Sequence, residues 1–192
     1  MKPVASSLGF GRYFTDHMFT AKCDEVSGWH QPEVIPYQPL PLDPGASVLH
    51  YGQALFEGLK AFRQKDGGFA IFRPDFNWRR MAAGADRLCM AAPPEELFLE
   101  GIKALVKTDS DWIPSEPGCA LYIRPTLIGT EAFLGVRPAE EYLFFVILSP
   151  VGAYYAEGTK PVRIWVEQEY IRAAPGGLGA TKAAANYATS LK

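Results

Sequence analysis

The sequence predicts an α+β fold: a small domain with a mainly antiparallel sheet and two helices, followed by the start of a second, larger domain. Strand candidates stand on both sides of two middle segments, and the apolar residues of those two segments follow a helical period. Strands are therefore grouped rather than alternated with helices, which favours antiparallel pairing. We expect residues 1–150 to form the small domain, 151–160 a connecting loop, and 161–192 the incomplete beginning of the large domain.

The first 50 residues contain many prolines and are expected to be largely irregular, because proline removes a hydrogen-bond donor and fixes φ. Short strands are predicted within this region, at residues 13–20 and 47–51. A third strand is predicted at residues 69–72, directly after the turn signal Asp66-Gly67-Gly68.

Two helices are predicted in the middle of the chain. The first begins at Pro74 and Asp75, which are typical start signals. Its apolar stripe is Trp78, Met81, Ala82, Ala85 and Leu88. The second begins at "PPEEL", where Glu95 and Glu96 oppose the positive end of the helix dipole. Its predicted buried face is Phe98, Ile102, Leu105 and Val106.

Strands return after the helices. "CALYIRPTL" (119–127) and "YLFFVIL" (142–148) are both strand candidates, and the second is apolar enough for the middle of a sheet. In "VRIWV" (162–166) apolar residues alternate, so a new sheet is expected to begin there. The final "ANYATSLK" predicts the start of a helix.

Composition excludes several classes of function. The net charge is −2, from 19 basic and 21 acidic residues, which argues against nucleic acid or an anionic membrane as partner. The three cysteines form no Cys-x-x-Cys pair, which fits a reduced, cytoplasmic protein. No apolar run reaches the roughly 20 residues of a membrane-spanning helix. The three histidines are too scattered to predict a metal site.

The stretch "GGLGATKAAANYA" (176–188) surrounds Lys182 with glycines and alanines. It is not a P-loop, because Lys182 is followed by Ala183 rather than Ser or Thr. It is not a dinucleotide fingerprint either, because a lysine stands where the third glycine belongs. A small, apolar flank favours a neutral, nucleophilic amine and leaves room for a flat ring. From these residues alone, an exposed lysine and a reactive amine both remain open.

Five longer stretches of sequence decide between these two interpretations by resemblance. They are "LHYGQALFEGLKAFR" (49–63), "FRPDFNWRRM" (72–81), "ALYIRPTLIGTEAFLGV" (120–136), "LSPVGAYY" (148–155) and "RAAPGGLGATKAAANYATSL" (172–191). Through these stretches the chain closely resembles the N-terminal half of branched-chain amino acid aminotransferases, which are pyridoxal phosphate enzymes of fold type IV. The resemblance follows the family order through nearly the whole chain.

The resemblance implies roles for cofactor-binding residues. Lys182 matches the lysine that binds pyridoxal 5′-phosphate covalently and moves the proton between substrate and cofactor. Arg80 matches the arginine that binds the cofactor phosphate, with Arg79 as the neighbouring alternative. Tyr187 matches a tyrosine that hydrogen-bonds the phenolic oxygen of the cofactor.

The resemblance also implies a substrate pocket. Arg124 matches the arginine that accommodates the acidic co-substrate, and strand alternation predicts that it shares a face with Tyr122. Leu134 and Val136 match loop residues that complete the pocket of a neighbouring subunit, so a homodimer is implied. The aromatic wall is Phe10, Tyr51, Phe56, Tyr122 and Tyr154.

The implied activity is transamination of leucine, isoleucine or valine with 2-oxoglutarate by a ping-pong mechanism, so the partners are small amino and 2-oxo acids. Alternatives are a D-amino acid aminotransferase or an aminodeoxychorismate lyase of the same fold, and a noncatalytic dimerisation fragment. Two departures stand out. Ala184 and Ala185 replace the usual glycine pair, and the chain ends before the carboxylate that binds the pyridine nitrogen and most of the phosphate cup. We therefore expect residues 1–192 alone to be inactive.

Overall fold

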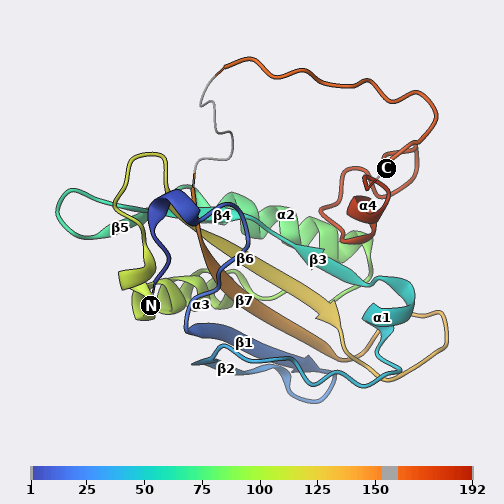
Figure 1. Ribbon diagram of the computed structural model, residues 1–192. Coiled ribbons are helices and arrows are strands. Elements are labelled where there is room, and N and C mark those ends of the chain that lie inside the picture. Colours follow the sequence, from blue (N-terminus) through green and yellow to red (C-terminus); the bar gives the residue numbers. More distant parts are fainter. Residues whose placement is uncertain (1, 153–159, 192) are drawn as a thin grey trace.

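The computed structural model describes residues 2–152 and 160–191 (Figure 1). In chain order its elements are the 3₁₀ helix η1 (Ala5–Ser7), β1 (His17–Asp24), β2 (Gly28–Pro36), α1 (Ser47–Tyr51), β3 (Ala54–Phe56), β4 (Leu59–Arg63), β5 (Phe69–Ile71), α2 (Pro74–Arg87), α3 (Glu95–Thr108), the 3₁₀ helix η2 (Ser110–Trp112), β6 (Ala120–Gly129), β7 (Tyr142–Val151) and α4 (Ala185–Ala188). The predicted helices α2 and α3, and strands β5, β6 and β7, are confirmed within a few residues.

The strands of the described residues form one seven-stranded sheet in the order β2-β1-β7-β6-β4-β5, with β3 also paired to β6. All neighbours are antiparallel, and β6 and β7 pair along their whole length, from Ala120↔Val151 to Gly129↔Tyr142. The long helices α2 and α3 lie together on one face of this sheet (Figure 1). The predicted α+β class with a mainly antiparallel sheet is confirmed.

The core lies between α3 and the central strands. The predicted face of α3 is buried, and Phe98 is 0% exposed. Its ring stacks on Phe144 of β7 at 5.7 Å between centroids, and Phe19 of β1 meets the same Phe144 ring at 6.1 Å. These aromatic contacts fix α3 on the sheet, because each ring buries a large apolar area.

Gly101 is the point where α3 approaches β1 most tightly. A Cβ added there would lie 2.7 Å from Cε1 and Cζ of the Phe19 ring. Gly101→Ala is therefore expected to lower the free energy of unfolding by about 1–2 kcal/mol, because overpacking outweighs the better helix propensity of alanine. Urea unfolding would measure this. The exposed Lys107→Ala on the same helix should change stability by less than about 0.5 kcal/mol, and an unchanged Gly101→Ala would contradict the packing argument.

The N-terminal region differs from its prediction. The strand expected at residues 13–20 is β1 at His17–Asp24, and β2 runs through a stretch expected to be irregular. β2 is an edge strand, and its pairing with β1 shifts register between Thr20 and Lys22, stepping over Gln31 and Pro32. The missing N–H of Pro32 therefore costs no ladder hydrogen bond.

The strand predicted at residues 47–51 is wrong, since Ser47–Tyr51 forms the short helix α1. Gly52 ends this helix in the left-handed region, with φ 61°, and its N–H donates to the carbonyl of Val48 at 3.2 Å. A glycine directly after a short apolar run is a typical helix C-terminal signal, and it outweighs the strand propensity of Val48.

The strand predicted at residues 162–166 is also wrong. Residues 160–171 contain no strand, and Ile164 and Val166 are 82% and 74% exposed. A strand requires a hydrogen-bonded neighbour, and none of the described residues pairs with this segment. The segment extends away from the sheet and returns to α4, beside α2 and β3 (Figure 1). The helix expected from "ANYATSLK" is confirmed only as the single turn α4.

Candidate active site

Lys182 is fixed against the edge of β3 by backbone hydrogen bonds. The Lys182 carbonyl accepts a hydrogen bond from the N–H of Phe56 at 3.1 Å, and the N–H of Ala184 donates to the carbonyl of Ala54 at 3.0 Å. Between them, Ala183 pairs with Leu55 as an isolated bridge and is fully buried. The main chain around Lys182 is thus held by the sheet, although it lies far from β3 in sequence.

The glycine-rich turn before Lys182 is closed by Asn186. This amide is buried and donates both hydrogens, to the carbonyl of Leu178 at 2.6 Å and to that of Thr181 at 2.7 Å. Helix α2 approaches the same turn at Gly84, where a Cβ would lie 3.2 Å from Cγ2 of Thr181. Sequence reasoning did not identify Asn186; the signal for it was a polar residue within an alanine-rich flank.

The amine of Lys182 lies among aromatic groups. Nζ donates to the hydroxyl of Tyr187 at 2.8 Å and lies 4.5 Å from the centroid of the Phe56 ring. The rings of Phe56 and Tyr187 meet edge to face at 4.8 Å. Lys182 is partly buried, while Ala184 and Ala185 are exposed. The structure therefore brings Lys182, Tyr187 and Phe56 into one cluster.

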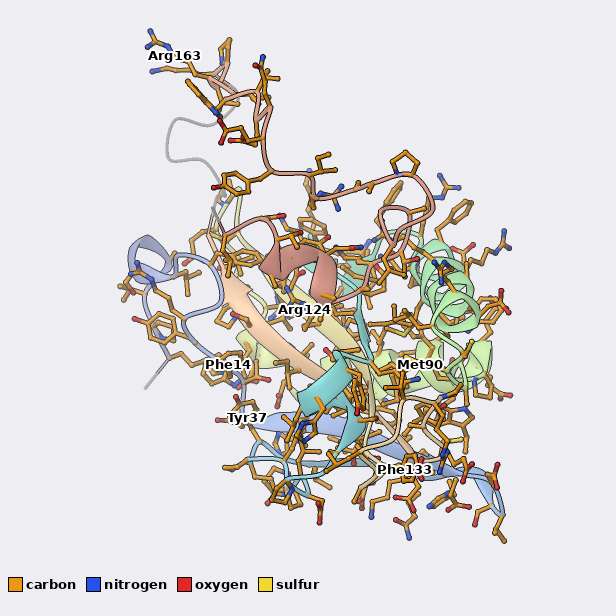
Figure 2. All side chains as sticks on the ribbon, turned by 90° about the vertical axis from the view of Figure 1, so that its right-hand side faces the viewer. Phe14, Tyr37, Met90, Arg124, Phe133 and Arg163 are labelled. Carbon is orange, nitrogen blue, oxygen red and sulfur yellow. The ribbon has the colours of Figure 1, made fainter. Side chains whose placement is uncertain are left out.

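Arg124 extends this cluster along β6. Its Cζ lies 4.6 Å from the Phe56 centroid, and its Nη2 donates to the hydroxyl of Tyr122 at 3.1 Å. The Tyr122 ring in turn meets Phe10 at 4.9 Å. The Nε of Arg124 is buried and has no hydrogen-bond partner among the described residues. Figure 2 shows Arg124 beneath α4, at the face of the sheet.

Arg80 lies on α2 and binds a buried carboxylate. Its Nε donates to Oε1 of Glu57 at 2.7 Å and its Nη2 to Oε2 at 2.6 Å. The hydrogen bond with Glu57 raises the pKa of Arg80, burial opposes the rise, and the negative charge of Glu57 adds to it. The guanidinium thus stays charged near the aromatic cluster. Arg79, the alternative candidate for the phosphate-binding arginine, has a more exposed side chain than Arg80, and its Nη2 lies 3.9 Å from Oδ2 of Asp75.

Glu57 was not identified from the sequence. It is 0% exposed in the turn between β3 and β4, and its N–H donates to the carbonyl of Pro125 at 2.8 Å. Asn77 donates a further hydrogen bond to its Oε2 at 2.8 Å. A single carboxylate inside the apolar phrase "ALFEGL" was the available signal, because a buried carboxylate requires a partner.

Tyr51, Leu134 and Val136 form a separate group at the α1 end of the molecule. The Tyr51 hydroxyl donates to the carbonyl of Leu134. Leu134 and Val136 are 64% and 87% exposed, on the loop between β6 and β7. These residues lie outside the contacts that surround Lys182. Tyr154, the remaining member of the predicted aromatic wall, lies outside the described residues.

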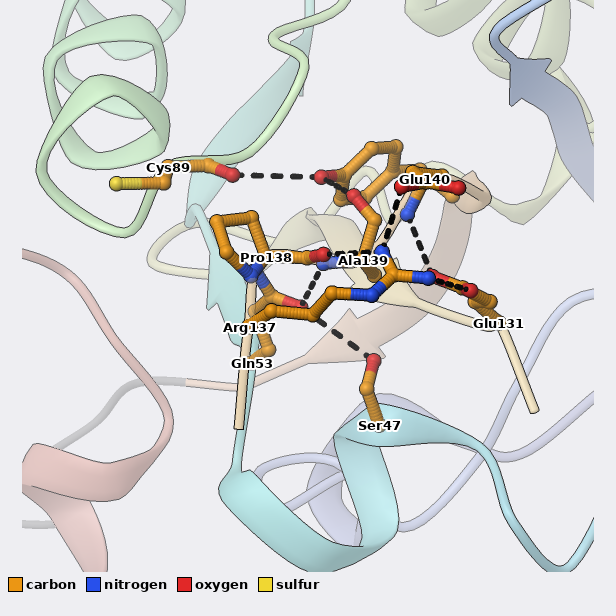
Figure 3. A network of polar contacts seen from close by, with 9 residues as sticks. Ser47, Gln53, Cys89, Glu131, Arg137, Pro138, Ala139 and Glu140 are labelled. Atoms are coloured by element: carbon orange, nitrogen blue, oxygen red, sulfur yellow. Dashed lines mark hydrogen bonds and ion pairs between the residues drawn. The ribbon is translucent and has the colours of Figure 1, made fainter. Parts of the chain in front are cut away.

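A polar network holds the loop that carries Leu134 and Val136 (Figure 3). Arg137 pairs with Glu131 at 2.5 Å and with Glu140 at 2.7 Å. The side-chain oxygen of Gln53 accepts a hydrogen bond from the N–H of Ala139 at 3.3 Å. The side-chain Nε2 of Gln53 donates at 3.2 Å to the carbonyl of Leu88, which lies at the end of α2. The exposed apolar residues are therefore presented on an ordered loop.

Among the described residues, no group of three or more His, Cys, Asp or Glu side chains is arranged to hold a metal ion. No helix among them is both long and apolar enough to cross a membrane. The described site itself places an amine, phenols and guanidinium groups around an aromatic surface, a combination that suits a flat carbonyl compound that carries an anionic group.

Comparison with known proteins supports the resemblance seen in the motifs. No protein-family model matches the chain. Branched-chain-amino-acid transaminase 1 of Bacillus subtilis (strain 168) is 54% identical over 192 residues, covering 100% of this chain and 54% of the relative. The chain thus spans about half the length of the curated relatives it matches. The resemblance to branched-chain aminotransferases is confirmed along its entire length.

Solved structures agree on the fold. The branched-chain amino acid aminotransferase of Escherichia coli matches with a TM-score of 0.66 at 20% identity, covering 92% of this chain and 54% of that one. The enzyme of Thermobaculum terrenum, solved in the PLP-form (holo-form), matches with a TM-score of 0.66 at 17% identity, covering 92% and 53%. The predicted fold type IV architecture is confirmed.

Proposed function

We propose, from the similarity of the entire chain to branched-chain-amino-acid aminotransferases, that this protein transfers amino groups between leucine, isoleucine or valine and 2-oxoglutarate. The proposed cofactor is pyridoxal 5′-phosphate, used in a ping-pong mechanism that yields branched 2-oxo acids and glutamate. The observation that carries the proposal is the Lys182 amine, hydrogen-bonded to Tyr187 at 2.8 Å and packed 4.5 Å from the Phe56 ring.

The residues present fit this cofactor. Lys182 supplies the amine that binds its aldehyde carbon, Tyr187 a hydroxyl for its phenolic oxygen, and Arg80 a planar fork for its phosphate. The buried, unpartnered Nε of Arg124 adds a donor for an anionic substrate group. When bound, the cofactor supplies an electron sink for the bonds at the substrate Cα. Pyridoxal compounds are also named in the structures of similar enzymes.

Lys182 performs the proton transfer in this proposal. Its amine would remove the proton from the substrate Cα and would deliver a proton to the cofactor. This requires the Lys182 nitrogen to be unprotonated at the start. The Tyr187 hydroxyl accepts a hydrogen bond from Nζ at 2.8 Å and so orients the amine. The Phe56 ring covers the amine and excludes water from that side.

The substrate pocket is proposed around Arg124. The Arg124 Cζ atom lies 4.6 Å from the Phe56 ring centroid and 5.2 Å from that of Tyr122, and the Tyr122 ring meets Phe10, so these rings offer apolar surfaces around Arg124 that suit a branched aliphatic side chain. The guanidinium of Arg124, with its unpartnered Nε, suits the second carboxylate of glutamate in the same pocket. Tyr51 and Tyr154 complete the aromatic wall in this proposal.

We further propose a homodimer in which Leu134 and Val136 of one subunit complete the pocket of the other. Their exposure of 64% and 87% on a loop held by Arg137 supports this role, because exposed apolar groups on an ordered surface are typical of interfaces. We place the reaction in the cytoplasm, in keeping with the free thiols of Cys23, Cys89 and Cys119.

Amine transfer from three donors tests the function. We call the full-length protein loaded with pyridoxal phosphate the holoenzyme. Its kcat/KM for leucine is expected to be at least about ten-fold higher than for D-alanine or aminodeoxychorismate, because the pocket discriminates by side-chain shape and carboxylate position. Glutamate formed from 2-oxoglutarate measures the transfer from leucine or D-alanine, and the release of pyruvate measures lyase cleavage of aminodeoxychorismate. Preference for D-alanine or aminodeoxychorismate would replace the proposed substrate class, and the absence of any transfer would indicate a noncatalytic interaction module.

A further inference from the structure

Glu57 is a buried charge that the proposed chemistry leaves unexplained. Its side chain is fully enclosed, and an isolated carboxylate in such a place is strongly unfavourable unless it is paired and hydrogen-bonded. The described donors to it are Nε and Nη2 of Arg80, Nδ2 of Asn77 and the N–H of Gly58. Hydrophobic side chains would fill this space without the desolvation penalty of a buried carboxylate, so the charge itself requires an explanation.

The geometry of Arg80 supplies one. A guanidinium has five N–H groups in a fixed plane, and those on the Nε edge point away from those on the Nη1 edge. Glu57 binds the Nε and Nη2 side with both carboxylate oxygens, at 2.7 and 2.6 Å. The remaining edge, which includes Nη1, is therefore turned away from Glu57 in a set direction, and half of the Arg80 side chain is exposed.

The same short segment also positions the reactive amine. Phe56 directly precedes Glu57. Its ring centroid lies 4.5 Å from Nζ of Lys182, and its N–H donates to the Lys182 carbonyl at 3.1 Å. Directly after Glu57, the carbonyl of Gly58 accepts a hydrogen bond from Asn77 at 3.3 Å, which ties the segment to α2. One turn of chain thus sets the spacing between the amine and the guanidinium.

We propose that Glu57 is a positioning residue that holds Arg80 with its Nη1 edge directed at the phosphate of the cofactor, so that Glu57 determines how strongly the protein prefers a phosphorylated ligand. This inference rests on the proposed function. Asn77 supports Glu57 in this role through its own hydrogen bond to Oε2. Arg79, one residue earlier on α2, lies 3.9 Å from Asp75 and has no part in it.

Paired binding measurements test the proposal. Apo full-length protein is titrated with pyridoxal phosphate and with pyridoxal, which has the same ring and aldehyde but no phosphate, and the ratio of the two Kd values reports the contribution of the phosphate. Glu57→Gln removes the charge and Glu57→Asp shortens the reach. Each is expected to reduce this ratio about ten-fold, the size of one misplaced charge-assisted hydrogen bond, while the Kd for pyridoxal stays within about two-fold.

Matched variants keep the result interpretable. Asn77→Ala, which retains Arg80 and Glu57, is expected to reduce the ratio about two- to three-fold, and it serves if the Glu57 variants fail to fold. Arg79→Ala should leave the ratio unchanged. Equal weakening of both ligands by the Glu57 variants would indicate a purely structural role, and tighter binding of pyridoxal phosphate by Glu57→Gln would indicate repulsion of the phosphate; either result overturns the proposal. Wild-type protein that binds neither compound would contradict the proposed function itself.

Discussion

Lys182→Ala is expected to lower kcat for leucine transamination by about 10³-fold in the holoenzyme, the range associated with the loss of a positioned proton-transfer group. Alanine keeps the backbone hydrogen bonds that Lys182 makes through its carbonyl, so the edge pairing with β3 should survive. Only the amine, with its contacts to Tyr187 and Phe56, is removed. The loss should therefore appear in the chemistry and not in the thermal stability of the cofactor-free protein.

Reduction with borohydride identifies the same lysine directly. After incubation with pyridoxal phosphate, the wild-type protein is expected to carry the reduced label on the peptide that contains Lys182, and the alanine variant is expected to lack it. Lys103→Ala is a matched control, because Lys103 is exposed on α3 and pairs only weakly with Glu100 at 3.4 Å. A label found on another lysine of the wild-type protein, or a variant with normal kcat, would rule out the role of Lys182.

The parts of the fold that were predicted correctly are those in which local pattern and tertiary structure agree. Helix α3 shows a clear apolar stripe, and β7 is a long apolar run that the sheet places at its centre. Two of the errors arose where one residue changes the outcome. Gly52 ends a helix where a strand was expected, and the bulge at Pro32 permits a strand that proline was expected to prevent.

The candidate site could be predicted only in part, because its contacts join distant segments. Family resemblance singled out Lys182 and Arg80 as candidates, but the edge pairing that brings Lys182 to Phe56 links residues more than a hundred positions apart. Glu57 has its main partner on another element, and its apolar flank suggests burial without identifying that partner. Burial and pairing are tertiary properties, so a sequence pattern can suggest them but does not determine them.

Phe98→Ala is expected to lower the free energy of unfolding by about 3–5 kcal/mol, the usual cost of deleting a fully buried aromatic ring. Phe98 is 0% exposed and stacks on Phe144 at 5.7 Å. The loss is large beside the roughly 5–15 kcal/mol that stabilises an ordinary domain. Urea unfolding measures it, and Phe72→Ala is the matched control, because Phe72 is 76% exposed and should change stability by less than about 0.5 kcal/mol.

The Phe98 variant also separates the framework from the site. Phe144 lies on β7, which pairs with β6, the strand that carries Tyr122 and Arg124. Phe98 packs on the helix-covered face, whereas strand alternation directs Tyr122 and Arg124 to the opposite face. Well below its unfolding temperature, Phe98→Ala should therefore retain kcat within about two-fold, since catalytic effects require displacement of the reacting groups. A large loss of kcat in folded protein, or equal stability losses for Phe98→Ala and Phe72→Ala, would contradict this division between core and site.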